Sequence, residues 1–111
     1  MKTLKIKTII KSVNAIGNYQ AILITTELEK YFIKNEPVIL SFEGLKNVSS
    51  AFILHIIVNS YLDFPNSENL FTFVDVKEYI WKIKIQDAID LAKDPERLAL
   101  RNKLIEDLMN S

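Results

Sequence analysis

Apolar and polar residues alternate or cluster in ways that predict three β-strands. From Thr3 to Lys11 apolar residues alternate with lysines, a period of two that predicts a half-buried strand with basic side chains outward. Two short apolar runs, Pro37 to Phe42 and Leu70 to Val74, are rich in β-branched and aromatic residues. They predict two more strands, the first of them central and buried on both faces.

The segments that follow these strands have the spacing of helices. Apolar positions recur every three to four residues from Tyr19 to Lys34, with Asn18 as the expected N-cap. From Ser49 to Phe64 nearly every face is apolar, which predicts a deeply packed helix. Val76 to Lys93 mixes the two periods, but its alanines and long charged residues favour a helix. An Asp-Pro start signal then predicts an amphipathic helix over about 95–109.

The order of these elements predicts the fold class. Strands that alternate with helices indicate an α/β fold, a mixed and partly parallel sheet covered by helices, with an extra C-terminal helix. A length of 111 residues predicts one domain, 1–111, with a core over about 4–93. The chain is 49% hydrophobic and 25% charged, the balance of an ordinary globular protein.

Composition excludes several classes of function. The chain has no cysteine, which removes disulfides, thiolate catalysis and cysteine metal sites and favours a reducing, cytoplasmic location. Fourteen basic and fourteen acidic residues give no net field to attract nucleic acid. No apolar run approaches the ~18 residues of a membrane span, and lysines interrupt the N-terminal run. A lone histidine, His55, is a poor metal ligand, so no metal or cofactor is expected.

Two loops are candidate sites because they follow the predicted strands at their carboxyl ends. In open α/β sheets ligands bind at that edge, here Glu43 to Ser50 and Asp75 to Lys77. Ser49 or Ser50 begins a helix, where backbone N–H groups and the helix dipole favour negative charge. A phosphoserine there would be stabilised and would add about −1.5 to −2 charges to the loop. The alternative is that the serine is simply a helix cap.

The segment EPVILSFEGLKNVSSAFILHII resembles the STAS domain family, the sulfate transporter and anti-sigma factor antagonist domains. It is most similar to the STAS-like branch found in bacteria, whose pattern is an apolar strand, a Phe-x-Gly turn and a serine pair followed by phenylalanine. The resemblance spans roughly residues 17 to 93. The residues that match are Phe42, Gly44, Val48, Ser49, Ser50 and Phe52.

The resemblance implies a regulatory role for the serine pair. Ser50 falls on the serine that a partner kinase phosphorylates in anti-sigma factor antagonists. Ser49 replaces the aspartate of that pattern, and Ala51 and Phe52 replace its second serine and its glycine, so the surroundings of the hydroxyl differ. The family implies a protein partner, commonly a histidine-kinase-like ATPase that also acts as a serine kinase. Asp94 to Ser111 exceeds the family core and is a candidate contact surface.

We therefore expect a non-enzymatic signalling module that docks on a protein partner. Ser50 and Ser49 are the candidate phosphorylation sites, with no catalytic residue and no metal site. The expected partner-binding residues are Glu43, Asn47, Ser49, Ser50, Phe52 and Asp75.

Two other classes of function stay open. A small-ligand or nucleotide-binding α/β protein would use a pocket at the same strand ends, with Asp75, Glu43, Ser50 and His55 as the available groups. As an enzyme it would need a base beside its nucleophile, and His55 lies about a turn and a half into an apolar helix from Ser50. An oligomer-forming subunit, such as a homodimer, would instead expose apolar surface at Trp81 or along the last helix.

Overall fold

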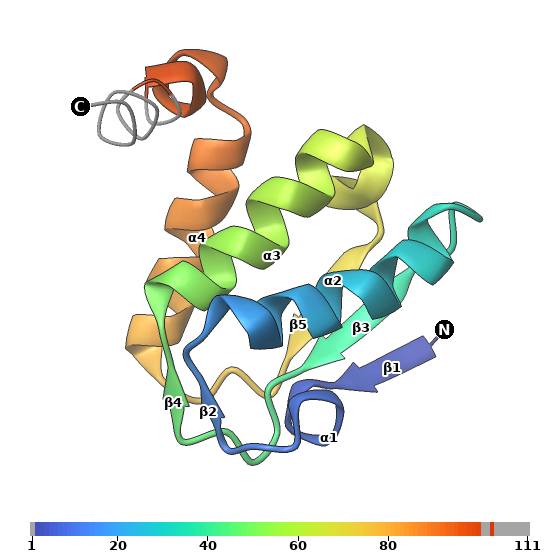
Figure 1. Ribbon diagram of the computed structural model, residues 1–111, viewed down its shortest axis with the longest axis vertical. Helices are drawn as coiled ribbons and strands as arrows, with labels where there is room; N and C mark the ends of the chain where they lie inside the picture. Colours follow the sequence, from blue (N-terminus) through green and yellow to red (C-terminus); the bar gives the residue numbers. More distant parts are fainter. Residues whose placement is uncertain (1, 101–102, 104–111) are drawn as a thin grey trace.

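The computed structural model describes residues 2–100 and 103 of the chain. Three strands form the main sheet in the order β1, β3, β5: β1 is Lys2–Lys5, β3 is Val38–Ser41 and β5 is Phe71–Val74. The central position of β3 confirms the prediction for this segment (Figure 1).

The strands of this sheet pair in one direction only. Leu4 lies opposite Leu40, and Leu40 opposite Phe73, in parallel ladders. The α/β fold class is confirmed, but the main sheet is parallel throughout its described strands, where a mixed sheet was expected. The physical reason is that each strand is followed by a helix that returns the chain to the same end of the sheet.

The prediction of a strand from Thr3 to Lys11 is right for its first three residues only and wrong for the rest. The strand ends at Lys5, and α1, Ile6–Ile10, forms one short helix instead. Ile6 and Ile10 are four residues apart, so a helical turn buries both on one side as well as alternation would. Lys11 then ends the helix in the left-handed region, with φ of 56°.

A second, two-stranded sheet was not predicted. β2, Asn14–Ala15, pairs in parallel with β4, Asn47–Val48. Strands of two residues are too short to show any periodicity, so only their pairing partner defines them. This ladder holds the segment before α2 beside the segment before α3.

The helix α2, Asn18–Phe32, confirms the second predicted element except for its cap. The N-cap is Gly17, and Asn18 is the first helical residue, which corrects the expected N-cap. The side chain of Gln20 stabilises this start, because its Oε1 accepts hydrogen bonds from the N–H groups of Ile16 at 2.9 Å and Gly17 at 3.0 Å.

The helices predicted over 49–64 and 76–93 are also confirmed, the second beginning three residues later than predicted, whereas the 3₁₀-helix between them was not predicted. α3 is Ser50–Asp63, the 3₁₀-helix η1 is Pro65–Asn69, and α4 is Tyr79–Ala92. Residues 95–100 are helical, which agrees with the start of the last predicted helix. Most of the rest of that expected helix lies outside the described residues. No helix in the described part of the chain is long and apolar enough to cross a membrane.

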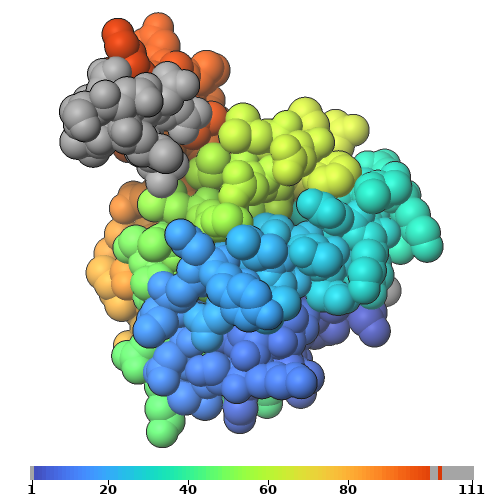
Figure 2. All heavy atoms as spheres, viewed as in Figure 1, coloured from blue at the N-terminus to red at the C-terminus, as the bar shows by residue number. Residues whose placement is uncertain are grey.

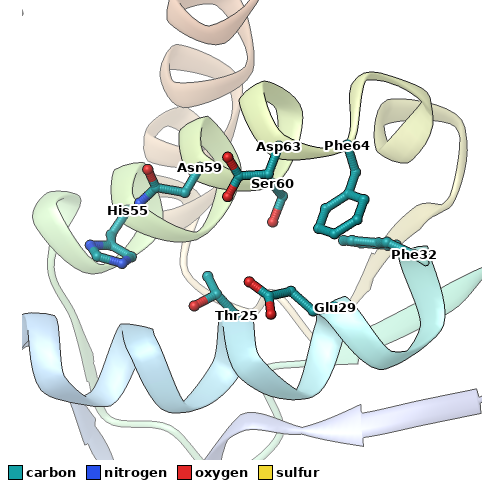
Figure 3. A pocket seen from close by; sticks show the side chains of 8 residues that line it. All are labelled: Thr25, Glu29, Phe32, His55, Asn59, Ser60, Asp63 and Phe64. Atoms are coloured by element: carbon teal, nitrogen blue, oxygen red, sulfur yellow. The ribbon is translucent and has the colours of Figure 1, made fainter.

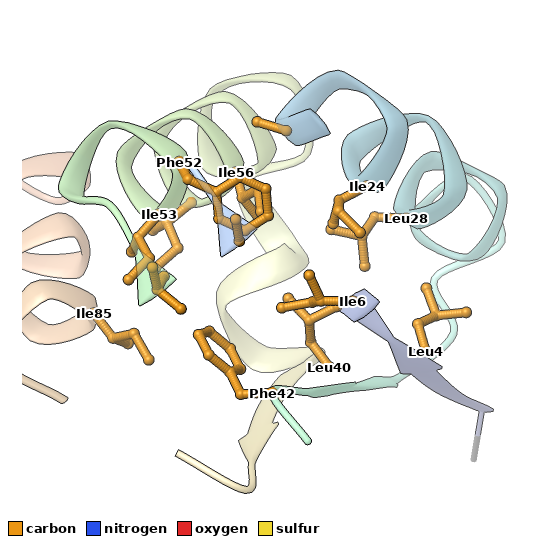
Figure 4. Close-up of a cluster of buried hydrophobic side chains, with 14 of the residues drawn as sticks. Leu4, Ile6, Ile24, Leu28, Leu40, Phe42, Phe52, Ile53, Ile56 and Ile85 are labelled. Atoms are coloured by element: carbon orange, nitrogen blue, oxygen red, sulfur yellow. The ribbon is translucent and has the colours of Figure 1, made fainter. Parts of the chain in front are cut away.

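The core lies between one face of the main sheet and the helices α2 and α3 (Figure 4). These two helices pack side by side, and their blue-to-cyan and green atoms adjoin at the surface (Figure 2). Strand residues Leu4, Leu40 and Phe42 meet Ile24 of α2 and Phe52 of α3 in this core. Each such buried side chain contributes roughly 1.5–3 kcal/mol. This layer fixes where α3 begins.

The helix α4 packs against α3 and closes the core at the sheet's end. Trp81 is buried, with its ring centroid 6.1 Å from that of Phe42. Trp81 therefore provides no exposed apolar surface, which corrects the expectation for an oligomer contact at this residue. The opposite face of the sheet carries the exposed side chains of Thr3 and Thr72.

Candidate functional site

The ends of β3 and β5 bring four polar residues together. The Ser41 hydroxyl donates a hydrogen bond to Oδ2 of Asp75 at 2.7 Å and accepts one from the N–H of Glu43 at 3.2 Å. Glu43 in turn forms an ion pair with Lys5, with 3.1 Å between Nζ and Oε2. Ser41 and Lys5 were not predicted here. The signal for Ser41 was its place as the last residue of a strand that is otherwise apolar.

The backbone of Asp75 explains how this carboxylate reaches Ser41. Asp75 has a φ of 59°, in the left-handed region that aspartate tolerates better than most residues. The chain turns sharply there, directly after β5. Ser41 is only 2% exposed, and its hydrogen bond to the exposed carboxylate of Asp75 satisfies the hydroxyl as a donor. The same bond holds the loop that begins at Asp75 against the end of β3.

A shallow hollow of about 200 Å³ lies beside this cluster, lined by Lys5, Lys7, Thr8, Glu43 and Gly44. Gly44 has a φ of 78°, in the left-handed region that favours glycine, whereas a Cβ there would displace only the flexible end of the Lys7 side chain. Of the four groups expected in a strand-end ligand pocket, only Glu43 lines this hollow, and Asp75, Ser50 and His55 do not. The ion pair between Lys5 and Glu43 already neutralises one charge of each sign in it.

The start of α3 places the two predicted serines in different environments. Ser49 is the N-cap: its Oγ accepts a hydrogen bond from the N–H of Phe52 at 3.1 Å and donates one to the carbonyl of Ile16 at 3.2 Å. The cap interpretation therefore holds for Ser49. Ser50 is the first helical residue and is exposed.

The other predicted site residues divide between these two places. Asn47 is exposed on β4, and its Nδ2 donates a hydrogen bond to Oδ1 of Asn14 at 2.7 Å, close to the serines along the chain. Glu43 and Asp75 belong to the strand-end cluster. Phe52 is fully buried, which corrects the expectation that it meets a partner. It lies on the inner face of α3, one helical turn from Ser49, and fills the core.

A second hollow, of about 330 Å³, lies beside Ser49, between β4 and the start of α4. The Nζ of Lys84 donates a hydrogen bond to the carbonyl of Val48 at 2.9 Å and joins the two walls. Two exposed isoleucines line it, Ile16 and Ile80, 58% and 50% exposed. These isoleucines give the hollow an apolar part, beside the charged side chains of Lys46, Glu78 and Lys84.

His55 lies apart from the serines. It is half-buried on α3 and lines a groove between α2 and α3 (Figure 3). No group of three or more His, Cys, Asp or Glu residues in the described ranges, 2–100 and 103, is arranged to hold a metal ion.

The comparison with protein families decides the identity of the domain. The sequence model of the family described as "STAS-like domain of unknown function (DUF4325)" matches residues 20–81, more than half of the chain. The chain belongs to this family. The matched STAS-like region includes Ser49, Ser50 and the whole of α3. No curated protein and no solved structure matches the chain.

Proposed function

We propose that this STAS-like domain is a non-enzymatic regulatory module that docks on another protein through the start of α3. The observation that carries the proposal is an exposed Ser50 at the N-terminus of α3, next in sequence to Ser49, which lines one hollow with the exposed side chains of Ile16 and Ile80. Membership of the STAS-like family supports a regulatory role. Asn47 lines the same hollow, and Glu43 and Asp75 of the strand-end cluster are proposed as further contact residues.

Phosphorylation of Ser50 is the proposed switch. The first turn of α3 carries no acidic residue, so its unpaired N–H groups and dipole would stabilise the added negative charge. Ser49 is the weaker candidate because its hydroxyl already donates to Ile16 and accepts from Phe52. The same charge placed on a docking surface with exposed apolar residues would weaken docking.

The proposed partner is a histidine-kinase-like ATPase that also acts as a serine kinase. The Ser50 hydroxyl would attack the γ-phosphorus of ATP, forming an Oγ–P bond as the bond to ADP breaks. A base of the kinase would take the hydroxyl proton. The STAS-like domain would thus be the substrate and target of the partner's chemistry.

Intact-mass measurement after incubation with ATP and a kinase-like ATPase encoded beside its gene tests the switch. The wild type should gain one phosphate, Ser50→Ala should gain none, and Ser49→Ala should still gain it. An unmodified wild type, or equal modification of Ser50→Ala, would contradict the proposal.

Docking itself has a separate test, because it does not require phosphorylation. Ile80→Asp should weaken binding to the same ATPase by about tenfold, the effect of a charge at a desolvated contact. Ile33→Asp is the matched control, since Ile33 is 72% exposed at the far end of α2 and should leave affinity unchanged. Equal loss in both variants would show that this surface is not the contact.

The alternative, a small-ligand or nucleotide binder, rests on the strand-end hollow beside Lys7 and Gly44. A thermal-shift screen with nucleotides and common metabolites tests it. A saturable shift that is lost in Lys7→Gln would favour this function over docking.

A further inference from the structure

A polar groove separates the later parts of α2 and α3 (Figure 3). It has a volume of about 150 Å³ and lies away from the serine pair along α3. Residues four apart on α2 and on α3 face it, because that spacing places side chains on one face of a helix. Its lining residues are Thr25, Glu29, Phe32, His55, Asn59, Ser60, Asp63 and Phe64.

A largely buried serine, Ser60, contributes its hydroxyl to this groove. Ser60 is only 5% exposed, and its hydroxyl points into the groove toward Glu29 (Figure 3). None of the side-chain hydrogen bonds among the described residues involves it. Ser67 also has an unpartnered hydroxyl, but that one is sealed from solvent. The Ser60 oxygen is not sealed in this way, so it is free to bond to a molecule that enters the groove.

The groove is negatively charged. It contains the carboxylates of Glu29 and Asp63, and none of its described lining residues is a lysine or arginine. The salt bridges among the described residues join lysines to Glu43, Glu27 and Glu68, and neither Glu29 nor Asp63 takes part in one. Two like charges in one small groove repel each other, so a cation placed between them is stabilised.

One wall of the groove is aromatic. The rings of Phe32 and Phe64 lie with centroids 5.9 Å apart and planes inclined at 54°. An aromatic wall accommodates an apolar stem, and a ring face attracts a cation held above it. Carboxylates and aromatic rings together are a suitable environment for an organic cation rather than for a bare ion.

We propose that this groove binds an organic cation, a guanidinium or primary ammonium group on a short apolar stem. The carboxylates of Glu29 and Asp63 would accept its N–H donors, and the Ser60 hydroxyl and Asn59 amide would complete its hydrogen bonds. A volume of about 150 Å³ is well below the roughly 300–1,000 Å³ of sites for larger ligands, which excludes a nucleotide. A metal ion is disfavoured because the described residues offer no set of three suitable ligands.

Two sources supply such a group: a free amine, or an arginine or lysine side chain of a bound protein. Agmatine represents the first source. A short peptide with one central arginine, compared with the same peptide carrying citrulline, represents the second. Butylurea has the shape of the guanidinium probe without its charge.

An NMR titration of the ¹⁵N-labelled chain with these probes tests the proposal. Agmatine or the arginine peptide should cause saturable shifts at the amides of Glu29, Asn59 and Ser60, while butylurea and magnesium chloride should not. Binding by the peptide alone supports a protein source, and binding by agmatine supports a free amine. No saturable shift with either, or equal shifts with butylurea or magnesium, overturns the proposal.

Charge variants connect the shifts to these carboxylates. The double variant Glu29→Gln, Asp63→Asn should weaken binding about tenfold or more, since each removes a charge partner of the cation. The matched control is Asp87→Asn, Glu96→Gln, which makes the same change of charge at two exposed residues outside the groove. Equal weakening by the control pair would mean diffuse attraction and would overturn the site.

Ser60→Ala gives a signature that a purely structural serine would not give. No hydrogen bond among the described side chains involves this hydroxyl, and alanine has a higher helix propensity than serine, so the substitution should raise the Tm slightly, while cation binding should weaken about threefold. A lower Tm together with unchanged binding would contradict the assigned role of Ser60.

Discussion

Ser49 and Ser60 lie near opposite ends of the same helix and carry the same hydroxyl, but their surroundings differ. Ser49 has both of its hydrogen-bonding roles filled by the backbone, at Phe52 and Ile16. Ser60 is the more buried of the two, and its hydroxyl opens into a negatively charged groove without a partner. A hydroxyl that is hydrogen-bonded to the backbone stabilises the fold, whereas one without a protein partner can still form hydrogen bonds to a ligand.

The difference arises from what faces each end of α3. At its start, the β2–β4 ladder brings backbone carbonyls beside the helix, and these have free lone pairs to accept a hydroxyl donor. At Ser60 the neighbour is α2, whose backbone groups are already bonded within the helix. The α2 residues that line the groove there are Thr25, Glu29 and Phe32, and only Glu29 carries a charged acceptor.

Ser41 extends this comparison to a hydroxyl bonded to a charged group. Removing the Ser41 hydroxyl should have the largest effect on stability among these serine substitutions. Ser41→Ala should lower the free energy of unfolding by about 1.5–2 kcal/mol, because a bond to a carboxylate is worth more than a neutral one. Urea unfolding measures it. Asp75→Asn, which keeps an acceptor for the hydroxyl, should lower the free energy of unfolding by a smaller amount. An equal or larger loss in Asp75→Asn would contradict the assignment of Ser41 as the donor.

Ser49→Ala should lower the free energy of unfolding by about 1 kcal/mol through loss of the helix cap. Ser49→Asp is the informative companion, since aspartate also caps and its charge suits a helix N-terminus. Chemical denaturation should give a clearly larger free energy of unfolding for Ser49→Asp than for Ser49→Ala. If both lose the same amount, the bond to Ile16 rather than the cap supports the helix.

Ser60→Ala should change stability in the opposite direction, raising the free energy of unfolding by about 0.5–1 kcal/mol. The reason is that the variant loses no hydrogen bond to another described residue and gains the higher helix propensity of alanine inside α3. Calorimetry of the ligand-free protein measures it, with Ser49→Ala as the contrast on the same helix. A loss of stability would mean that Ser60 is already satisfied, and the comparison between the two serines would fail.

Ser50→Ala should have the smallest effect on stability, within about 0.5 kcal/mol, because Ser50 is exposed at the first position of α3. Thermal unfolding checks this. A loss above 1 kcal/mol would show that Ser50 shares the capping role of Ser49, and a phosphate there would then disturb the helix itself.

Much of the fold was predictable because its longer elements have clear periods. The helices α2 and α3 and the strands β3 and β5 appear where apolar spacing predicted them. The short helix α1 was missed because Ile6 and Ile10 fit alternation and a helical turn equally well. The β2–β4 ladder was missed because two-residue strands carry no pattern of their own.

The candidate site was predictable only in part. A serine before an apolar helix predicted the cap at Ser49, and local spacing was enough for that. The burial of Phe52 and the bond from Ser41 to Asp75 depend on which elements pack together. Ser60 fitted the apolar stripe of its helix, and nothing in the sequence distinguishes a hydroxyl that packs from one that faces an open groove.

The parallel pairing of β1 with β3 has a consequence for how the chain folds. No strand of the main sheet can form a hairpin with its neighbour in sequence, so Leu4 finds Leu40 only after α1, β2 and α2 have been traversed. Such long-range pairing is slow, because the chain loses the entropy of closing a large loop before the stabilising contacts between the strands form. The helices should therefore acquire structure before the sheet does, and the amino-terminal strand should be among the last segments to gain protection against hydrogen exchange during refolding.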